Sequence, residues 1–315
     1  MSGPVAGGWD AVVVGAGMGG GLAARALAQA GLRVLILERG RAGWRAEETR
    51  IDVATADPVA RLVRGLWPEP VDAGAGPFHA PLGCGVGGSS AFYAATLERP
   101  EPGDLDAWPV AYVALRPFYE RAEDWLAVEG EPDPLSPEPP PALRAPPPPS
   151  AADAAIVARL GRNGMHPYRL HAGLRRLPGC AECLGRKCPR ACKMDGRSAG
   201  VEPALATGRA ALWTEAEALR ILHGGGRALG VELRRGGAVE AVAARQVLLA
   251  AGALSTPRLL MASGLGGGAA GRNLMLHLNE TFAVWPGVEG GGPSKGIGMR
   301  DLMRIGGEPM GMVQA

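Results

Sequence analysis

Four cysteines lie within thirteen residues, in the segment CAECLGRKCPRACK: Cys180, Cys183, Cys188 and Cys192. The chain holds only one more, Cys84. Thiolates at such spacing can hold an iron–sulfur cluster or zinc, pair as disulfides, or remain free. Because no basic stretch precedes the first apolar run, we expect a cytoplasmic protein. The reducing cytoplasm then disfavours disulfides.

A second pattern consists of glycines. Gly15, Gly17 and Gly20 form GxGxxG between the β-branched run DAVVV and a helical segment that ends at Gly31. Glycines at this spacing permit a tight turn, approach of the backbone to a pyrophosphate, and close packing of helix on strand. Glu38 closes the next apolar run, RVLILE, where a carboxylate can accept hydrogen bonds from an adenosine ribose. The sequence therefore predicts a dinucleotide site, and the acid argues against NADP.

Composition excludes two other classes of protein. With 33 basic against 31 acidic residues, the chain shows no footprint of nucleic-acid binding. It contains no run of eighteen or more apolar residues, so we expect no transmembrane helix. Its 49 glycines and 28 prolines suit a turn-rich α/β protein.

The elements expected in the N-terminal half begin with a βαβ unit. Strands over residues 10–14 and 33–38 enclose the first helix, and a Gly-rich turn covers 83–90. A further helix is expected over 113–128. Residues 132–150 are dense in proline, which predicts an extended connector rather than helix or central strand.

The elements expected in the C-terminal half return to a β pattern. ALRIL and RALGVELRR flank HGGG, which predicts an antiparallel hairpin. The apolar run RQVLLA predicts a buried strand. A helix is then expected to open near Thr256, with Pro257 in its first turn.

Three longer stretches carry a resemblance to a known family. The first is GVGGSSAFYAATLERP followed by WPVAYVALRPFYERAEDWLAV, and the second is SAGVEPALATGRAALWTEAEALRIL. The third is GALSTPRLLMASGLG followed by GRNLMLH. In this order and spacing the chain resembles the glucose–methanol–choline (GMC) family of FAD-dependent alcohol oxidoreductases, over about residues 10–280. The resemblance implies FAD rather than NAD.

The resemblance also implies an α/β fold with two domains. A Rossmann-like FAD/NAD(P)-binding domain, with a parallel sheet and a β-hairpin insertion, would be formed by residues 1–100 and 203–275. Residues 101–202 would hold an inserted helix, the Pro-rich linker and the Cys-rich loop, and 276–315 would begin an incomplete α+β substrate-binding domain. The residues implied for the cofactor are Gly15, Gly17 and Gly20 (pyrophosphate), Glu38 (ribose), Gly87, Gly88, Ser89 and Ser90 (ribityl chain and flavin), Glu217 and Ala218 (adenine), and Ala251 and Gly252.

The function implied is oxidation of a CH–OH group in a small-molecule alcohol, sugar or sterol, with hydride passing from the alcohol carbon to flavin N5. The family supplies a His paired with a second His or an Asn as base for the alcohol proton. No such pair occurs up to Ala315, and His277 belongs to another family motif, so we expect the pair beyond Ala315. We therefore expect residues 1–315 alone to be an N-terminal portion that is poorly active and prone to aggregate. The other histidines are expected to be solvated or capping: His79, His166, His171 and His223.

The resemblance bears on the cysteines as well. Dehydrogenases of this family that act on sugars and sugar acids hold an iron–sulfur cluster in a run resembling C-x4-C-x3-C, which Cys183, Cys188 and Cys192 reproduce. Such a cluster lets flavin electrons leave singly to a cytochrome partner. Those enzymes have a further cysteine directly beside the first, whereas Cys180 lies three residues before Cys183. An iron–sulfur cluster, zinc, and free or redox-sensitive thiols stay open, and Cys84 is expected to be a small buried residue.

Two other functions stay open. A non-catalytic FAD-binding or electron-transfer subunit, or the product of a decayed gene, needs no base. The second open function is that of an NAD-dependent oxidoreductase or a flavin disulfide reductase. The reductase needs a redox CxxC soon after the first βαβ unit, whereas Cys180 and Cys183 lie far downstream. As an alcohol-oxidising enzyme, the protein would use a cytochrome or a quinone as electron acceptor.

Overall fold

The chain forms two compact units. A computed structural model describes residues 8–42, 66–72, 77–139, 141–185, 187–275, 282 and 296–315. The first unit comprises Met1–Tyr93 and Leu177–Leu276, and the second comprises Ala94–Arg176 and His277–Ala315. These limits differ from the expected domain boundaries at 100 and 203, because the Cys-rich segment groups with the first unit.

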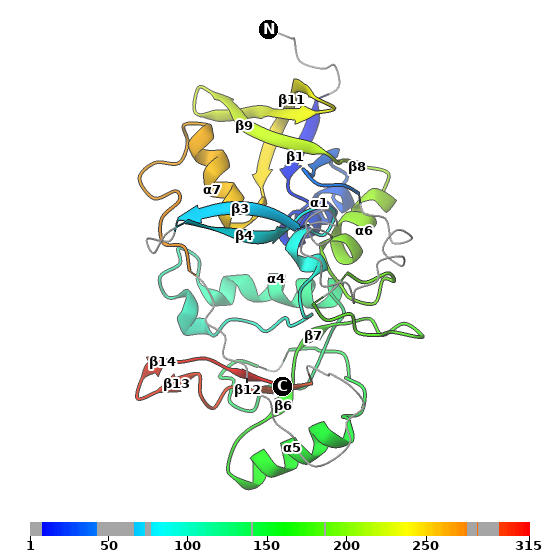
Figure 1. Ribbon diagram of the computed structural model, residues 1–315, viewed down its shortest axis with the longest axis vertical. Helices are drawn as coiled ribbons and strands as arrows, with labels where there is room; N and C mark the ends of the chain where they lie inside the picture. The colour runs from blue at the N-terminus through cyan, green and yellow to red at the C-terminus, as the bar shows by residue number, and fades with distance from the viewer. Residues whose placement is uncertain are drawn as a thin grey trace. The chain divides into compact units, whose positions relative to one another are not determined.

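A six-stranded mixed sheet forms the centre of the first unit, with the order β8-β2-β1-β11-β10-β9 (Figure 1). Neighbours among the first four strands are parallel, and β10 is antiparallel to both β11 and β9. This arrangement confirms the predicted Rossmann-like sheet with a β-hairpin insertion. The strands are β1 (Trp9–Val14), β2 (Val34–Leu37), β8 (Ala210–Trp213), β9 (Ala216–Gly224), β10 (Arg227–Arg235) and β11 (Ala238–Leu249).

Alternate side chains of β1 and β2 enter two apolar layers, as expected for strands buried on both faces. Val13 and Ile36 belong to a cluster that includes buried alanines of α1 (Met18–Gln29) and α6 (Glu202–Ala206). Val12 and Leu35 belong to the opposite cluster, with side chains from β9, β10 and α7 (Gly252–Ala262). The two helices α1 and α6 lie side by side (Figure 1).

Glycines set the distance between α1 and the segment η3 (Gly196–Val201). A Cβ added at Gly21 would overlap the backbone of Gly196, and one added at Gly200 would overlap the backbone of Gly21. The two segments therefore pack backbone against backbone. This contact, on the segment that follows the cysteines, explains why the Cys-rich region belongs to the first unit.

The helix after β11 begins earlier than its sequence predicted. Its first residue is Gly252, whereas the expected start lay near Thr256, so Pro257 stands inside the helix and not in its first turn. Gly252 has a φ of +86°, which lets the chain reverse directly after the strand. The expected hairpin around HGGG is confirmed as β9–β10, and the helix expected over 113–128 as α4 (Tyr112–Trp125).

The described part of the second unit contains short strands, the 3-10 helix η2 (Pro102–Leu105) and the α-helices α4 and α5 (Ala151–Arg162). A three-stranded sheet has the order β15-β12-β6. The Pro-rich segment lies inside this unit and does not connect the two units. None of the helices in the described part of the chain has the length and apolar character that a membrane span requires. The strands are β5 (Val128–Glu129), β6 (Tyr168–Arg169), β7 (Ala172–Gly173), β12 (Ile297–Met299), β13 (Arg304–Ile305), β14 (Glu308–Pro309) and β15 (Val313–Gln314).

Two glycine substitutions test the contact between α1 and η3. Gly200→Ala forces a methyl group into the backbone of Gly21, so we expect the free energy of unfolding to fall by about 2–3 kcal/mol. Gly19→Ala is the matched control, because a Cβ at Gly19 has no neighbour within 4 Å. It should raise stability by about 0.5–1 kcal/mol through helix propensity. Urea unfolding measures both, and equal effects would contradict the packing.

Candidate cofactor site

A cavity of about 760 Å³ lies in the first unit, where β1, β2 and β11 end. Its wall contains Val14 and Leu37, the last residues of β1 and β2, and Ala250, which follows β11. The carboxyl ends of parallel strands are the usual place for ligands in open α/β sheets. The volume falls in the range of small-molecule and cofactor sites.

Most of the residues predicted from sequence for the cofactor line this one cavity. They come from the first βα turn, the end of β2, the turn around η1 (Gly88–Ala91), the start of β9 and the start of α7. The remaining two, Gly20 and Gly87, are not part of the wall. The lining residues among those predicted are Gly15, Gly17, Glu38, Gly88, Ser89, Ser90, Glu217, Ala218, Ala251 and Gly252.

The glycines of the GxGxxG motif meet different demands. Gly15 has a φ of +106°, and a Cβ there would overlap the backbone of Ala250. A Cβ at Gly20 would likewise overlap the carbonyl of Gly15. At Gly17 the φ is −75° and a Cβ would have no neighbour within 4 Å. The fold itself therefore requires Gly15 and Gly20, whereas Gly17 leaves open space at the cavity wall.

The open space at Gly17 lies where α1 begins, since Gly17 is the N-cap of this helix. The first N–H groups of a helix have no partner within it and carry partial positive charge. No acidic side chain occupies the first turn of α1. A glycine wall beside unneutralised N–H groups fits a phosphate-bearing dinucleotide.

Glu38 holds three loops of the cavity together. The side chain is 6% exposed, and its Oε2 accepts a hydrogen bond from the Ala16 N–H at 3.1 Å. Its Oε1 accepts from the N–H groups of Gly40 at 2.9 Å and Gly85 at 3.0 Å. The carboxylate thus joins the first βα turn, the segment after β2 and the turn ahead of η1. The sequence pattern indicated the position of this acid but not these backbone contacts.

Both serines at η1 use their hydroxyl groups to fix the turn. Ser89 Oγ accepts from the Gly83 N–H at 3.1 Å. Ser90 Oγ donates to the Gly87 carbonyl at 2.6 Å and accepts from the Gly196 N–H at 2.9 Å. The Gly87 N–H in turn donates to the Ala16 carbonyl at 2.9 Å. Gly87 and Ser90 therefore tie this turn to the glycine motif and to η3.

Lys193 is a buried cation that no sequence pattern indicated. Its side chain is fully buried, and Nζ donates to the carbonyls of Ala91 at 2.8 Å and of Tyr93 and Cys183 at 3.1 Å each. The ammonium has three hydrogens, so all its donors are used. The contact fixes the Cys-rich loop to the chain that leaves η1.

The four clustered cysteines do not form a metal site in this structure. Among the residues that the structure describes, no group of three or more Cys, His, Asp or Glu side chains is arranged to hold a metal ion. Cys180, Cys183, Cys188 and Cys192 pack together in one cluster. The predicted iron–sulfur cluster and the zinc alternative therefore find no support. Cys84 is 8% exposed, which confirms that it is a small buried residue.

Two of these thiols have shifted pKa values. Burial raises the pKa of Cys192 to about 11, and the adjacent Cys180 thiol adds to the shift. Burial also opposes ionisation of Cys188. The N–H groups of Lys193, Arg190 and Cys192 nevertheless point at its sulfur and lower the pKa of that thiol. The pKa values of the two thiols thus differ because of their backbone neighbours and not because of burial alone.

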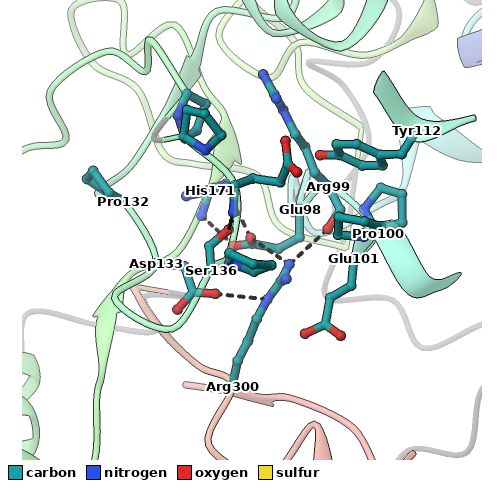
Figure 2. A pocket seen from close by; sticks show the side chains of 15 residues that line it. Glu98, Arg99, Pro100, Glu101, Tyr112, Pro132, Asp133, Ser136, His171 and Arg300 are labelled. Atoms are coloured by element: carbon teal, nitrogen blue, oxygen red, sulfur yellow. Dashed lines mark hydrogen bonds and ion pairs between the residues drawn. The ribbon is translucent and has the colours of Figure 1, made fainter. Parts of the chain in front are cut away.

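The second unit has a cavity of its own, of about 200 Å³, lined by charged residues (Figure 2). Arg300 lies between Glu98, at 3.3 Å, and Asp133, at 3.6 Å, and donates to the Arg99 carbonyl at 2.9 Å. His171 is 5% exposed, with Nδ1 3.1 Å from Glu98 and Nε2 2.8 Å from the Glu131 carbonyl. The expectation that His171 is solvated or capping was wrong, because the fold closes over this ion-pair network.

The other histidines fit simpler roles. His166 is half-exposed and pairs with Asp301 at 2.8 Å. Through Nε2, exposed His223 contacts the carbonyl of Ser263 at 2.9 Å, and Ser263 is the C-cap of α7, so the capping role is confirmed there. The side chain of His79, and all of His277, lie outside the described residues.

Sheet topology and cavity together define a Rossmann-like α/β fold with a cavity at the carboxyl ends of its parallel strands. The GMC oxidoreductase family model matches residues 10–279. The chain therefore belongs to the GMC oxidoreductases, a family of FAD-binding flavoproteins, and the resemblance drawn from its motifs is confirmed.

Individual relatives agree with this assignment. An uncharacterised GMC-type oxidoreductase of Mycobacterium tuberculosis is 36% identical over 302 residues, covering 89% of this chain and 44% of that protein. Paromamine 6′-oxidase of Streptomyces fradiae is 28% identical over 309 residues, covering 86% and 54%. The chain thus spans about half the length of these relatives. The solved structure of a fungal aryl-alcohol oxidase shares the fold, with a TM-score of 0.58 at 19% identity over 82% of this chain and 48% of that one.

Replacing Lys193 by Met tests the contribution of the buried ammonium. The Met side chain has a similar length but leaves three carbonyls without their donor, so we expect the free energy of unfolding to fall by about 3 kcal/mol. Lys187→Met is the control: its ammonium lies 5.5 Å from the Phe92 ring centroid, a contact worth about 1 kcal/mol or less. Urea unfolding of both variants checks the difference, and similar losses would contradict it.

An arginine pair tests the network in the second unit. Arg300→Met leaves the buried carboxylates of Glu98 and Asp133 short of a cation, and we expect a loss of about 3–5 kcal/mol. Arg304→Met removes a surface pair with Glu101, 3.9 Å away, and should change stability by about 1 kcal/mol or less. Hydrogen exchange of second-unit amides during urea titration measures both. An unchanged Arg300→Met protein would show the network to be dispensable.

Proposed function

We propose that this chain binds FAD in the 760 Å³ cavity and belongs to an enzyme that oxidises a CH–OH group of a small-molecule donor. The observation that carries the proposal is Gly17. It lines the cavity at the N-terminus of α1, and none of the described residues has an atom within 4 Å of the position that its Cβ would take. A glycine that packing does not require, beside unpaired N–H groups, favours a ligand that needs close backbone approach.

The proposed roles follow the order of segments around the wall. The Gly15–Gly17 turn and the start of α1 would hold the pyrophosphate, and Glu38 the adenosine ribose. Glu217 and Ala218 at the start of β9 would border the adenine, and Ala251 and Gly252 would approach from the end of β11. Gly88, Ser89 and Ser90 would border the ribityl chain and flavin.

Bound FAD supplies the hydride acceptor for oxidation of the alcohol carbon. The residues of the chain act by holding the dinucleotide in place. No histidine is among the described residues that line the cavity, so we assign no base for the alcohol proton to them. The substrate class proposed, small alcohols and sugars, is supported by relatives whose names describe alcohol-type substrates, such as paromamine 6′-oxidase.

Substitution of Gly17 tests the proposed binding of FAD. Gly17→Val fills the space at the helix start, so we expect the dissociation constant for FAD to rise at least about tenfold while far-UV circular dichroism stays unchanged. Gly268→Val is the control, since its Cβ also meets nothing within 4 Å but lies outside the cavity. Titration of the protein into FAD, followed by flavin fluorescence, gives both constants. If the unaltered chain leaves flavin fluorescence unchanged, the proposal fails.

A further inference from the structure

The cysteine cluster contains one thiol that solvent can reach. Cys183, Cys188 and Cys192 are buried, with exposed fractions of 7%, 2% and 2%, whereas Cys180 is partly exposed. All four are thiols, and none is part of a disulfide. Their side chains pack in one cluster. The Cys180 thiol adjoins that of Cys192, and Cys180 is the member of the cluster that is not fully buried.

The backbone around Cys180 holds its sulfur in a defined position. The Glu182 N–H donates to Cys180 Sγ at 3.4 Å. Glu182 and Cys183 have φ values of +57° and +50°, in the left-handed region that side chains other than glycine rarely adopt. Strained backbone of this kind gathers at functional sites. It turns the chain so that Cys180 returns to the cluster.

We propose that Cys180 and Cys192 form an oxidisable dithiol that hydrogen peroxide converts to a disulfide. In the first step the Cys180 sulfur attacks one peroxide oxygen, the O–O bond breaks, and the departing hydroxide takes up a proton as water. Cys180 is left as a sulfenic acid. In the second step the Cys192 sulfur displaces the sulfenic hydroxyl, which leaves with a proton as a second water, and the S–S bond forms. The two thiols lose two electrons and the peroxide gains two.

The position of this pair links it to the cofactor cavity. Cys192 directly precedes Lys193, whose ammonium binds the carbonyls of Ala91 and Tyr93 at the end of the η1 turn. Cys180 lies in the loop that supplies the third carbonyl, from Cys183. A disulfide would tether both sides of this loop, so the oxidation state of the thiols bears on the segment that carries Gly88 and Ser90.

Peptide mapping tests the proposal without relying on FAD or on enzyme activity. The full chain is reduced, freed of reductant, exposed to hydrogen peroxide, alkylated and digested with trypsin. Cys180 and Cys183 then share peptide 177–186, while Cys188 and Cys192 fall on peptides 188–190 and 191–193. We expect 177–186 joined to 191–193 at a mass about 2 Da below the sum of the reduced peptides. Untreated protein should show all four cluster cysteines alkylated, and Cys84 as well.

Two variants and a metal assay complete the test. Cys180→Ser should abolish the cross-link and leave Cys192 open to alkylation after unfolding, whereas Cys84→Ser should keep the cross-link. The proposal is overturned by a cross-link to peptide 188–190, by a cross-link that persists in Cys180→Ser, or by over-oxidation of Cys180 with Cys192 still a thiol. One equivalent of zinc, or iron held by the four sulfurs, in the purified protein would also overturn it.

Discussion

Two buried charges of opposite sign hold the walls of the cofactor cavity. The carboxylate of Glu38 gathers three backbone N–H groups, and the ammonium of Lys193 gathers three backbone carbonyls. A buried charge is tolerable only when hydrogen bonds replace its hydration, and bonds to charged groups are the stronger ones. Each charged group therefore fixes the arrangement of the loops whose backbone groups it binds. The two charged groups act together with the hydrogen bonds of Gly87 and Ser90, which join the η1 turn to the glycine motif and to η3.

Glycines allow backbone segments of the first unit to approach one another closely. At Gly15, Gly20, Gly21 and Gly200 a side chain would collide with backbone, so these residues allow α1 to sit against β1, β11 and η3. The helix start is thereby placed at the cavity with its N–H groups exposed to a ligand. Gly17 differs, because a Cβ there would meet no atom of the described residues within 4 Å. Packing therefore requires Gly15 and Gly20 of the motif, whereas the proposed binding of a dinucleotide would account for Gly17.

Local patterns predicted the strands of the sheet and the part of the cavity wall formed by Gly15, Gly17 and Glu38, because each signal was short-range. The wall residues at η1, β9 and α7 were implied only by the family resemblance. The β-branched runs, the GxGxxG spacing and Glu38 at a strand end are all read within one βαβ unit. The burial of Lys193 and His171 depends on partners up to about a hundred residues away, and no periodicity encodes such contacts. The predicted start of α7 was wrong. Pro257 suggested a helix that begins near Thr256, whereas the helix begins at Gly252, a residue with positive φ that follows β11.

The hydrogen bonds of Glu38 limit what it can offer a dinucleotide. A carboxylate has about four lone-pair positions, and here Oε1 receives two N–H groups and the Cys84 thiol, at 3.9 Å. Oε2 receives one N–H group from the described residues, so the proposed contact with a ribose hydroxyl would use Oε2. A neutral amide could not replace the carboxylate, since its NH₂ group would face either the Ala16 N–H or the pair from Gly40 and Gly85. The acid at the end of β2 is thus fixed by the fold before any ligand binds, and the proposed ribose contact would have to use the oxygen with fewer donors, Oε2.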